Sequence, residues 1–404
     1  MVKSGSSFFL AARRCEIREL EQLALTSNLV SVIGGLIHAL QKERGLSNVF
    51  LASHGTRFGD RRLRQVAECE RVEQQLRLHF DVLDTDSVGV RNGARLFSRI
   101  ACVLHALDAL RALRQRIGAQ ALPTEDATAA IVRLIAGLLG VVFEAADGAT
   151  DPEISRALVA MFNFMQGKEF AGQERACGAA AFACGHTDET QRQQWQHLIA
   201  SQERCCEVFT GFCGAAMLAA WRANQAGASL VEIERLRHIG CAVHAQGTLN
   251  TGLSQEWFEA CTQRIDAMKA VEDLLASNLR VLCERKISVA RIEMRDQQAI
   301  LDALSHQADS DSDAPTSYGP RIERSILDLV QEQARRLQAM GCELDTVRAA
   351  LNERKVVERA KGLLMASRKL NEDDAYAMLR QTAMNQKRKL VDVAEAVLAM
   401  SDFL

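Results

Sequence analysis

Proline is almost absent from this chain. Only four prolines occur in 404 residues, at positions 123, 152, 315 and 320. Because proline breaks the hydrogen-bond ladder of a helix, a chain with so few can form long uninterrupted helices. Leucine, alanine, glutamine, glutamate and arginine, which favour helices, are abundant, and no segment alternates as a strand does. The sequence therefore predicts an all-α fold.

The overall composition excludes several classes of protein. The net charge of -2 excludes nucleic-acid binding through overall charge, although a local basic patch stays open. The apolar run from Phe8 to Ala12 is too short for a signal peptide. No stretch of about 18 uncharged apolar residues suggests a membrane span. We therefore expect a cytoplasmic protein that does not act on a membrane.

The cysteines and histidines form no metal-binding or catalytic motif. None of the twelve cysteines belongs to a CxxC pair, and the nine histidines give neither HExxH nor HxxxH. We interpret most cysteines as reduced core residues, with a redox or metal role as the alternative. A P-loop, a GxSxG motif and a nucleotide-binding glycine motif are also missing. We expect neither a cofactor nor a metal, and no enzymatic activity. A helical enzyme that uses arginines on phosphate esters is a weaker alternative.

The first third of the chain has the pattern of a helical bundle. Helices are expected at about 17–52, 56–83, 88–117 and 124–146, the last with Thr124 as a candidate N-cap. Short connections between four helices indicate an antiparallel bundle.

A second set of helices then begins at Asp151-Pro152. Expected spans are 152–183, 188–222, 229–243 and 254–289, with a shorter helix ending near 304. The segment QKERG at 41–45 is related to GQERA at 172–176. AECER at 67–71 is related to ASQER at 200–204, at nearly the same offset along the chain. This internal duplication predicts two similar four-helix bundles, at about 17–148 and 152–304, in one domain at 17–304.

The remaining residues differ in character. Residues 305–320 are rich in Asp, Ser and Pro, as a flexible linker is. Residues 321–350 carry a coiled-coil seam in which Gln333, expected to be partly exposed, fills one position. The seam predicts a homodimer or an intramolecular helix partner. The apolar seam residues are Ile326, Val330, Leu337, Met340, Leu344, Val347 and Leu351.

Residues 351–404 are expected to form a three-helix module, with helices to about 366, at 372–384 and at 388–400.

Two arginines of the duplicated segments lie on apolar helix faces. Arg44 follows Ile33, Ile37 and Leu40 at helical spacing, and Arg175 occupies the equivalent place in the second half. A buried guanidinium needs a partner. One interpretation is an internal salt bridge, to the preceding Glu43 or Glu174, or to Glu70 or Glu203 on the next helix. The other is an exchangeable planar oxyanion, which matches the donor fork of arginine. Small neighbours such as Gly45 and Gly172 would leave room for it. A third candidate is Arg237, although Arg235 makes the inward face of that helix ambiguous.

The C-terminal module resembles a known family. Residues 351–398 contain Glu358, the segment AKGLLM at 360–365, Glu372, Ala375, LR at 379–380, AM at 383–384, and KL at 389–390 leading to Ala394. These features are similar to the ANTAR family, three-helix RNA-binding domains of transcription antiterminators. Charge alone would favour a solvated face here. We interpret Ala360 and Gly362 as helix-packing positions. The resemblance implies an RNA-binding surface made by Arg354, Arg359, Lys361, Gly362, Arg380, Met384, Lys387, Arg388 and Lys389.

The first 300 residues also resemble a known family. The segments LQKERGLSNVFLASHG, GKEFAGQERACGAAAFACG and EIERLR are similar to the NIT family of nitrate- and nitrite-sensing domains. That resemblance implies two four-helix bundles that hold nitrate or nitrite between them, through arginines matching Arg44 and Arg237. Arg175 joins them through the internal repeat.

These patterns together predict a regulator. Nitrate or nitrite, as a signalling ligand, is expected to bind the sensor and release the C-terminal module. The module would then bind leader RNA hairpins, prevent a terminator from forming and allow genes of nitrate assimilation to be transcribed. The alternative is a dimeric signalling adaptor whose C-terminal helices bind protein.

Overall fold

A computed structural model describes residues 5–83, 93–225, 227–242, 248–310, 320–368, 370, 372–386 and 388–401. All regular secondary structure among these residues is helical, which confirms the predicted all-α fold. The chain forms two compact units, Met1–Gln333 and Ala334–Leu404. The boundary between them falls inside the predicted coiled-coil segment, 321–350.

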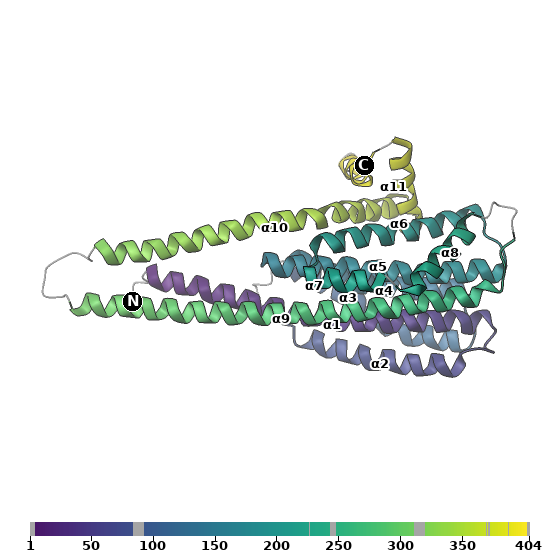
Figure 1. Cartoon of the computed structure of the whole chain (residues 1–404), viewed down its shortest axis with the longest axis horizontal. Coiled ribbons are helices and arrows are strands. Elements are labelled where there is room, and N and C mark those ends of the chain that lie inside the picture. The colour runs from purple at the N-terminus through teal and green to yellow at the C-terminus, as the bar shows by residue number, and fades with distance from the viewer. Residues whose placement is uncertain are drawn as a thin grey trace. The chain divides into compact units, whose positions relative to one another are not determined.

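The first bundle comprises α1 (Gly5–Ala52), α2 (Gly59–Asp81), α3 (Gly93–Gly118) and α4 (Thr124–Gly148). Helix α1 packs against α2 and α4, and α3 packs against α4 (Figure 1). The apolar stripe expected on α1 forms the core, with Ile33, Leu36, Ile37 and Leu40 inaccessible to solvent. Helix α1 is therefore the central helix of this bundle.

The second bundle is organised around α5. This helix packs against α6, α9 and α8, and α7 packs against α9. The ends of α5 follow from its sequence. The Asp151 side chain accepts hydrogen bonds from the backbone N–H groups of Glu153 and Ile154, both at 3.0 Å, and Pro152 occupies the first turn. Gly185 ends the helix in the left-handed conformation, at φ 74°. The helices of this bundle are α5 (Pro152–Cys184), α6 (Glu189–Phe212), α7 (Ala215–Gln225), α8 (Ala228–Ala242) and α9 (Leu253–Ser310).

Three helix boundaries differ from the sequence expectation. The span at 188–222 is divided between α6 and α7, because Cys213 takes an extended conformation at φ -75° and ψ 151°. Helix α9 is continuous and extends into the expected linker as far as Ser310, since it contains neither proline nor glycine. Thr124 is the first residue of α4, and Pro123 occupies the N-cap position without a side-chain hydrogen bond.

The two bundles meet along equivalent helices. Helix α1 packs against α5 and α9, and α4 packs against α5. The α1–α5 pair is parallel and in register. A Cβ atom at Gly34 would lie 3.5 Å from the Met165 side chain, and Gly34 and Met165 are separated along the chain by the same offset as Arg44 and Arg175. The duplicated segments therefore contact each other at the bundle interface.

The first part of α1 and the last part of α9 form a helical pair (Figure 1). Arg13 donates to Glu293 at 2.7 Å and to Gln297 at 2.9 Å, and Arg291 donates to Glu21 at 2.6 Å. Helix α9 thus connects the bundle interface with the segment that leads towards the C-terminal unit.

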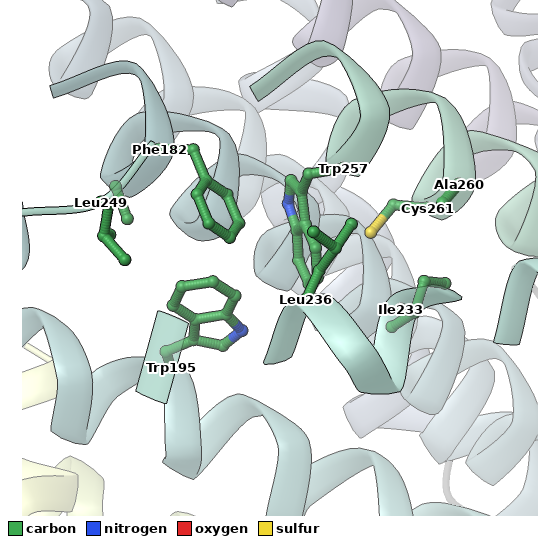
Figure 2. Close-up of a cluster of buried hydrophobic side chains, with 9 residues drawn as sticks. Phe182, Trp195, Ile233, Leu236, Leu249, Trp257, Ala260 and Cys261 are labelled. Carbon is green, nitrogen blue, oxygen red and sulfur yellow. The ribbon is translucent and has the colours of Figure 1, made fainter. Parts of the chain in front are cut away.

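An aromatic cluster fills one end of the second bundle (Figure 2). The rings of Trp195 and Trp257 meet edge to face with centroids 5.0 Å apart, and the Phe182 ring lies 5.9 Å from the first and 6.0 Å from the second. Trp195 donates its indole N–H to Glu174 at 3.1 Å, and Trp257 donates to the carbonyl oxygen of Arg175 at 3.0 Å. The cluster therefore contacts the Glu-Arg doublet of α5 directly.

Two helices are long and apolar enough to cross a membrane by length and composition alone. They are Ser7–Ala52, within α1, and Thr124–Gly148, which is α4. The most apolar windows are 61% and 56% buried inside the structure. Core helices of soluble proteins pass the same test, so the two helices are weak evidence for a membrane segment.

The cysteines are less uniformly buried than expected. Only Cys69, Cys205, Cys261 and Cys283 are buried, and the other eight are exposed or half-buried. Half-buried Cys177 and Cys241 also pack against a core cluster, so at least six of the twelve lie in or against the core.

The second unit contains three helices, as the sequence predicts. They are the last part of α10 (Pro320–Arg368), α11 (Glu372–Gln386) and α12 (Leu390–Ser401). Helix α10 is continuous, so the coiled-coil segment and the first helix of the module are one element. The buried core consists of Ala360, Leu364, Ala375, Leu379, Ala383, Val393 and Ala394.

Candidate functional site

Each of the two bundles contains a Glu-Arg doublet on its central helix. Glu43 and Arg44 lie on α1, and Glu174 and Arg175 lie on α5. Consecutive residues of a helix project about 100° apart, so the two side chains of a doublet leave in different directions. Both glutamates point into their own bundle, and both arginines point towards the other bundle, as their contacts show.

The two glutamates make equivalent ion pairs. Glu43 accepts from Arg114 of α3 at 2.9 and 2.8 Å, and Glu174 accepts from Arg237 of α8 at 2.6 Å through each oxygen. Bidentate carboxylate pairs of this kind are strong and oriented. Burial acts to lower the pKa of Arg237, but Glu174 and Glu234 hold it above its usual value. Arg237 is thus the counterpart of Arg114 and pairs within its own bundle.

The structure also resolves the ambiguity between Arg235 and Arg237. Arg235 is 46% exposed and pairs with Glu232 and Glu256 on the outside of the bundle. Arg237 is 8% exposed and faces the interior. Of the three predicted ligand-binding arginines, the structure brings Arg44 and Arg175 together, and it places Arg237 in the separate pair with Glu174.

Arg44 is paired with a carboxylate of the other bundle. Its Nη1 donates to Glu169 Oε1 at 2.5 Å and its Nη2 to Glu169 Oε2 at 3.3 Å. Glu169 also accepts from Gln41 at 2.8 Å and from Gln173 at 2.9 Å. Arg44 and Glu169 are 1% and 2% exposed. The Arg44 guanidinium is therefore paired with the Glu169 carboxylate of the same chain, and this ion pair is buried away from solvent.

This partner differs from those considered in the salt-bridge interpretation. Glu43, the preceding residue, pairs with Arg114, and Glu70 lies 3.6 Å from the same arginine. The α1–α5 contact supplies Glu169 instead, and sequence adjacency gives no sign of a contact between bundles. The available signal was the position of Glu169, a charged residue on the same apolar stripe as Arg175.

Arg175 has polar partners but no carboxylate among the described residues. Its Nη1 donates to the Thr262 hydroxyl at 3.0 Å, and its Nη2 donates to the carbonyl oxygen of Gln41 at 3.2 Å. The guanidinium also lies over the Phe258 ring, 4.9 Å from its centroid. Burial and the charge of Arg44 lower the pKa of Arg175 to about 10. Arg175 is 4% exposed, so this cation is buried without an ion-pair partner among the described residues.

Two glycines allow each arginine to approach the opposite helix. A Cβ atom at Gly172 would lie 2.6 Å from Arg44 Nη2, and one at Gly45 would lie 2.7 Å from Arg175 Nη2. The space that these glycines were expected to leave for a ligand is therefore occupied by the guanidinium of the other half.

Further charges lie along the same interface. Lys168 and Glu272 form a pair at 2.6 Å and are 0% and 1% exposed. Burial, followed by Lys168 and other nearby cations including Arg175, lowers the pKa of His38 to about 2. His38 is therefore neutral, and its Nδ1 is buried without a hydrogen-bond partner. No sequence pattern had singled out these residues as part of the site.

The sensor and the module both match known family models. The nitrate and nitrite sensing model (NIT) matches residues 35–280, which is more than half of the chain, and the ANTAR domain model matches residues 345–398. The chain belongs to the nitrate- and nitrite-sensing NIT family. It joins a NIT sensor to a C-terminal ANTAR domain, as a regulator of transcription antitermination.

Two similar proteins match nearly the whole chain, and a third matches only a short part of it. The chain is 35% identical to the nitrate regulatory protein of Klebsiella oxytoca over 398 residues, which cover 97% of this chain and 94% of the relative. It is 36% identical over 72 residues to the transcriptional regulatory protein PdtaR of Mycobacterium tuberculosis, covering 18% of this chain and 35% of PdtaR. The solved structure of the NasR transcription antiterminator is similar with a TM-score of 0.62 and 31% identity, over 98% of this chain and 99% of that chain.

The ANTAR domain exposes part of the predicted RNA-binding surface. Arg359, Arg388 and Lys389 are exposed, Met384 is 60% exposed, and Arg380 is half-buried. Lys361 is only 8% exposed. The Arg354 side chain and the whole of Lys387 lie outside the described residues.

The two small residues of the AKG segment behave differently. Ala360 is inaccessible to solvent and packs in the core, as expected. Gly362 is exposed, and a Cβ atom added there would meet nothing within 4 Å. The packing interpretation of Gly362 is therefore wrong, because no helix among the described residues approaches it.

Proposed function

We propose that the NIT sensor binds nitrate or nitrite at the α1–α5 interface, and that the bound anion controls RNA binding by the ANTAR domain. The observation that carries this proposal is the pair of neighbouring buried arginines, Arg44 and Arg175, of which only Arg44 has a carboxylate partner, Glu169, among the described residues. The family membership supports the same conclusion, and so do the two relatives that match nearly the whole chain, a nitrate regulatory protein and a transcription antiterminator.

The charges at the interface favour a small planar oxyanion. Two guanidiniums and one carboxylate leave one excess positive charge, which a monovalent anion would neutralise. The parallel N–H donors of a guanidinium match two oxygens of a planar anion. Both arginines are almost fully buried, so bulky phosphate esters are unsuited to the site. Arg237 is a weaker candidate for ligand contact, because its Nε and Nη2 groups already donate to the two carboxylate oxygens of Glu174.

Burial of the site provides a route from binding to signalling. Arg175 belongs to α5, and it donates hydrogen bonds to Thr262 of α9 and to Gln41 of α1. An anion therefore reaches Arg175 only if these three helices move apart. A ligand shifts such an equilibrium only when it binds one arrangement better than the other. We propose that the nitrate-bound arrangement, transmitted through α9, releases the ANTAR domain to bind leader RNA hairpins and block terminator formation. The protein would act in the cytoplasm and without a cofactor.

The sensor test is a calorimetric titration of the full chain with sodium nitrate and sodium nitrite, with sodium chloride as the salt control. Arg175→Lys keeps a positive charge but loses the fork, so nitrate affinity should fall by about tenfold or more. The matched control is Arg235→Lys on the exposed side of α8, which should bind as the wild type does. Equal affinity in all three proteins would remove Arg175 from the site. The same comparison with Arg44→Lys tests the second arginine.

The output test measures binding to a two-hairpin leader RNA with and without nitrate at several salt concentrations. Replacement of Arg388 or Lys389 by alanine should weaken binding and lower the salt dependence by about one ion for each phosphate partner removed. Absence of RNA binding in both conditions would favour the alternative, a signalling adaptor whose C-terminal helices bind protein.

We also propose that the coiled-coil seam forms a homodimer. Val330 and Leu337, two seam residues of α10, are 42% and 51% exposed. An apolar seam of this kind is normally covered by a second helix. Light scattering should give twice the chain mass, and Leu337→Glu should reduce it to one chain mass.

A further inference from the structure

The first part of α1 and the last part of α9 carry the same short motif. Residues 14–18 read RCEIR, and residues 291–295 read RIEMR. Each segment has arginine at its first and fifth positions, glutamate at the third and an apolar residue at the fourth. Positions that are three and four residues apart in a helix share one face. The two arginines and the apolar residue of each motif therefore lie on the same face of its helix.

The two motifs line one pocket between α1 and α9. Arg13 donates to both motif glutamates, to Glu16 at 2.6 Å and to Glu293 at 2.7 Å, and so engages both carboxylates. The pocket has a volume of about 390 Å³. Sites for small molecules have volumes of roughly 300–1,000 Å³. The lining residues are Arg14, Ile17, Arg18, Arg291, Met294 and Arg295.

This pocket has an excess of positive charge. Among the described residues, Arg14, Arg18 and Arg295 have neither an ion pair nor a hydrogen bond through their side chains. Arg291 pairs with Glu21 at 2.6 Å, but the two side chains are 54% and 41% exposed, and such a pair is weak. None of the lining residues is acidic. Four guanidiniums around one pocket repel one another unless an anion lies between them.

The positive charge is confined to the pocket. Residues 13–21 and 291–296 contain as many acidic as basic side chains, so the helical pair as a whole is not a basic surface. A nucleic-acid strand needs a groove that is basic along its length. A pocket that is basic at one place suits a compact anion instead.

The side chains of the pocket favour linked phosphate groups. Each guanidinium offers two parallel N–H donors to a pair of oxygens, so several arginines match an anion with several oxygen pairs. Ile17, which is 8% exposed, and half-buried Met294 add an apolar surface. A methionine side chain adapts to a planar ring, such as a nucleobase.

We propose that this pocket is a second anion site, which binds a compact ligand with two or three linked phosphate groups, either free or attached to a nucleoside. Arg44 lies 26 residues beyond Arg18 on the continuous helix α1, which is about 39 Å at about 1.5 Å per residue. The site is therefore separate from the proposed nitrate site and does not depend on it. A ligand bound to both motifs would join α1 to α9 and stabilise the helical pair.

The test is a calorimetric titration of the full chain with ATP, GTP and sodium tripolyphosphate, without divalent cations. Each chain should bind one ligand, with an affinity that falls as sodium chloride is added. Tighter binding of a nucleoside triphosphate would identify a nucleotide as the ligand, because the base adds contacts with the apolar surface. Tighter binding of tripolyphosphate would identify an inorganic polyphosphate. Either result supports a site for linked phosphates.

Two double variants with the same change in charge test the pocket itself. Arg14→Gln with Arg295→Gln removes one arginine from each motif and should lower the affinity by at least about tenfold. Arg235→Gln with Arg280→Gln removes two exposed arginines elsewhere and should bind within about twofold of the wild type. Nitrate affinity should be the same in both double variants.

Three results would overturn the inference. The first is no binding of any of the three ligands by the wild type, and the second is equal affinity in the two double variants. The third is a six-nucleotide single-stranded RNA that binds through Arg14 and Arg295 while ATP, GTP and tripolyphosphate do not, which would make the pocket part of an RNA surface. Absence of nitrate binding by the wild type would contradict the proposed function but not this inference.

Discussion

The two halves of the sensor share one sequence element but use it differently at their interface. Inside each bundle the doublet glutamate pairs with an arginine of another helix: Glu43 with Arg114, and Glu174 with Arg237. These pairs are alike in geometry and burial. Between the bundles the equivalence ends, since Arg44 has a carboxylate partner and Arg175 has none among the described residues.

This difference distinguishes contacts that stabilise each bundle from contacts that a ligand can change. An ion pair inside one bundle stabilises that bundle, and both copies need it for the same reason. A contact between the bundles fixes only how the two bundles are arranged, so the two equivalent contacts of this kind are free to diverge in sequence. The asymmetric interface is then the place where a ligand can act on the relative position of the halves.

The largest effect is expected from breaking an intrabundle pair. Arg237→Ala would leave Glu174 as a buried and uncompensated charge, since Glu174 is 1% exposed. The free energy of unfolding should fall by about 3–5 kcal/mol, as measured by urea denaturation. Arg114→Ala should have a similar effect if the two halves are structurally equivalent. Arg235→Ala, which removes an exposed arginine from the same helix, should leave stability unchanged. A much smaller effect of Arg237→Ala than of Arg114→Ala would contradict the equivalence.

A smaller effect is expected from the aromatic cluster beside Glu174 and Arg175. A Cβ atom at Gly178 would lie 2.4 Å from the indole of Trp257, so Gly178→Ala forces the ring or the helix to shift. Such overpacking should cost about 1–3 kcal/mol in thermal or urea unfolding. Gly211→Ala is the control, because nothing lies within 4 Å of its added methyl group. That change should stabilise α6 slightly, by about 1 kcal/mol or less. Equal stabilities would mean that the α5–α9 packing is looser than described.

Much of this arrangement was predictable from sequence. Scarcity of proline and the spacing of apolar residues predicted the helices, and the QKERG and GQERA segments predicted the duplication and the interior position of Arg44 and Arg175. The three-helix C-terminal module was also expected, and Ala360, interpreted as a helix-packing position because it is small, lies in its core.

The partners of the arginines were not predictable in the same way. Glu169 contacts Arg44, and His38 lies 3.8 Å from Asp266, in both cases far away in the sequence. Only the packing of α1 against α5 and α9 brings these residues together. Helix periodicity gives the face on which a residue lies but not the helix that covers the face. The role of Gly362 was misread for the same reason, since small residues on a helix permit close packing without requiring it.

The two glycines of the interface offer a more selective comparison of the halves. Gly45→Ala would press on Arg175, and Gly172→Ala would press on Arg44, in each case at the flexible end of the side chain. Stability should change little, but nitrate affinity should fall about tenfold in Gly45→Ala and by less than about threefold in Gly172→Ala. Calorimetry measures both. A larger loss in Gly172→Ala than in Gly45→Ala would show that Arg44 contributes more to nitrate binding than Arg175 does.

The smallest effect concerns acid. Burial raises the pKa of Glu174, but Arg237 and Gln202 outweigh it, so the pKa in the folded protein lies below the usual 4.5. Between the lowered pKa and pH 4.5, folded Glu174 therefore binds fewer protons than unfolded Glu174 does. The stability that the ionised Glu174 contributes is complete above pH 4.5 and is lost as the pH falls through the pKa of the folded protein.

Tryptophan fluorescence makes this acid effect specific to one half. All three tryptophans, Trp195, Trp221 and Trp257, belong to the second bundle, and Trp195 donates directly to Glu174. Protonation of Glu174 weakens that bundle from within, so the fluorescence change should begin no later than the loss of helical circular dichroism, which reports on both bundles. Fluorescence that changes only after the helical signal is lost would show that the Glu174 pair is not the acid-sensitive element of the second half.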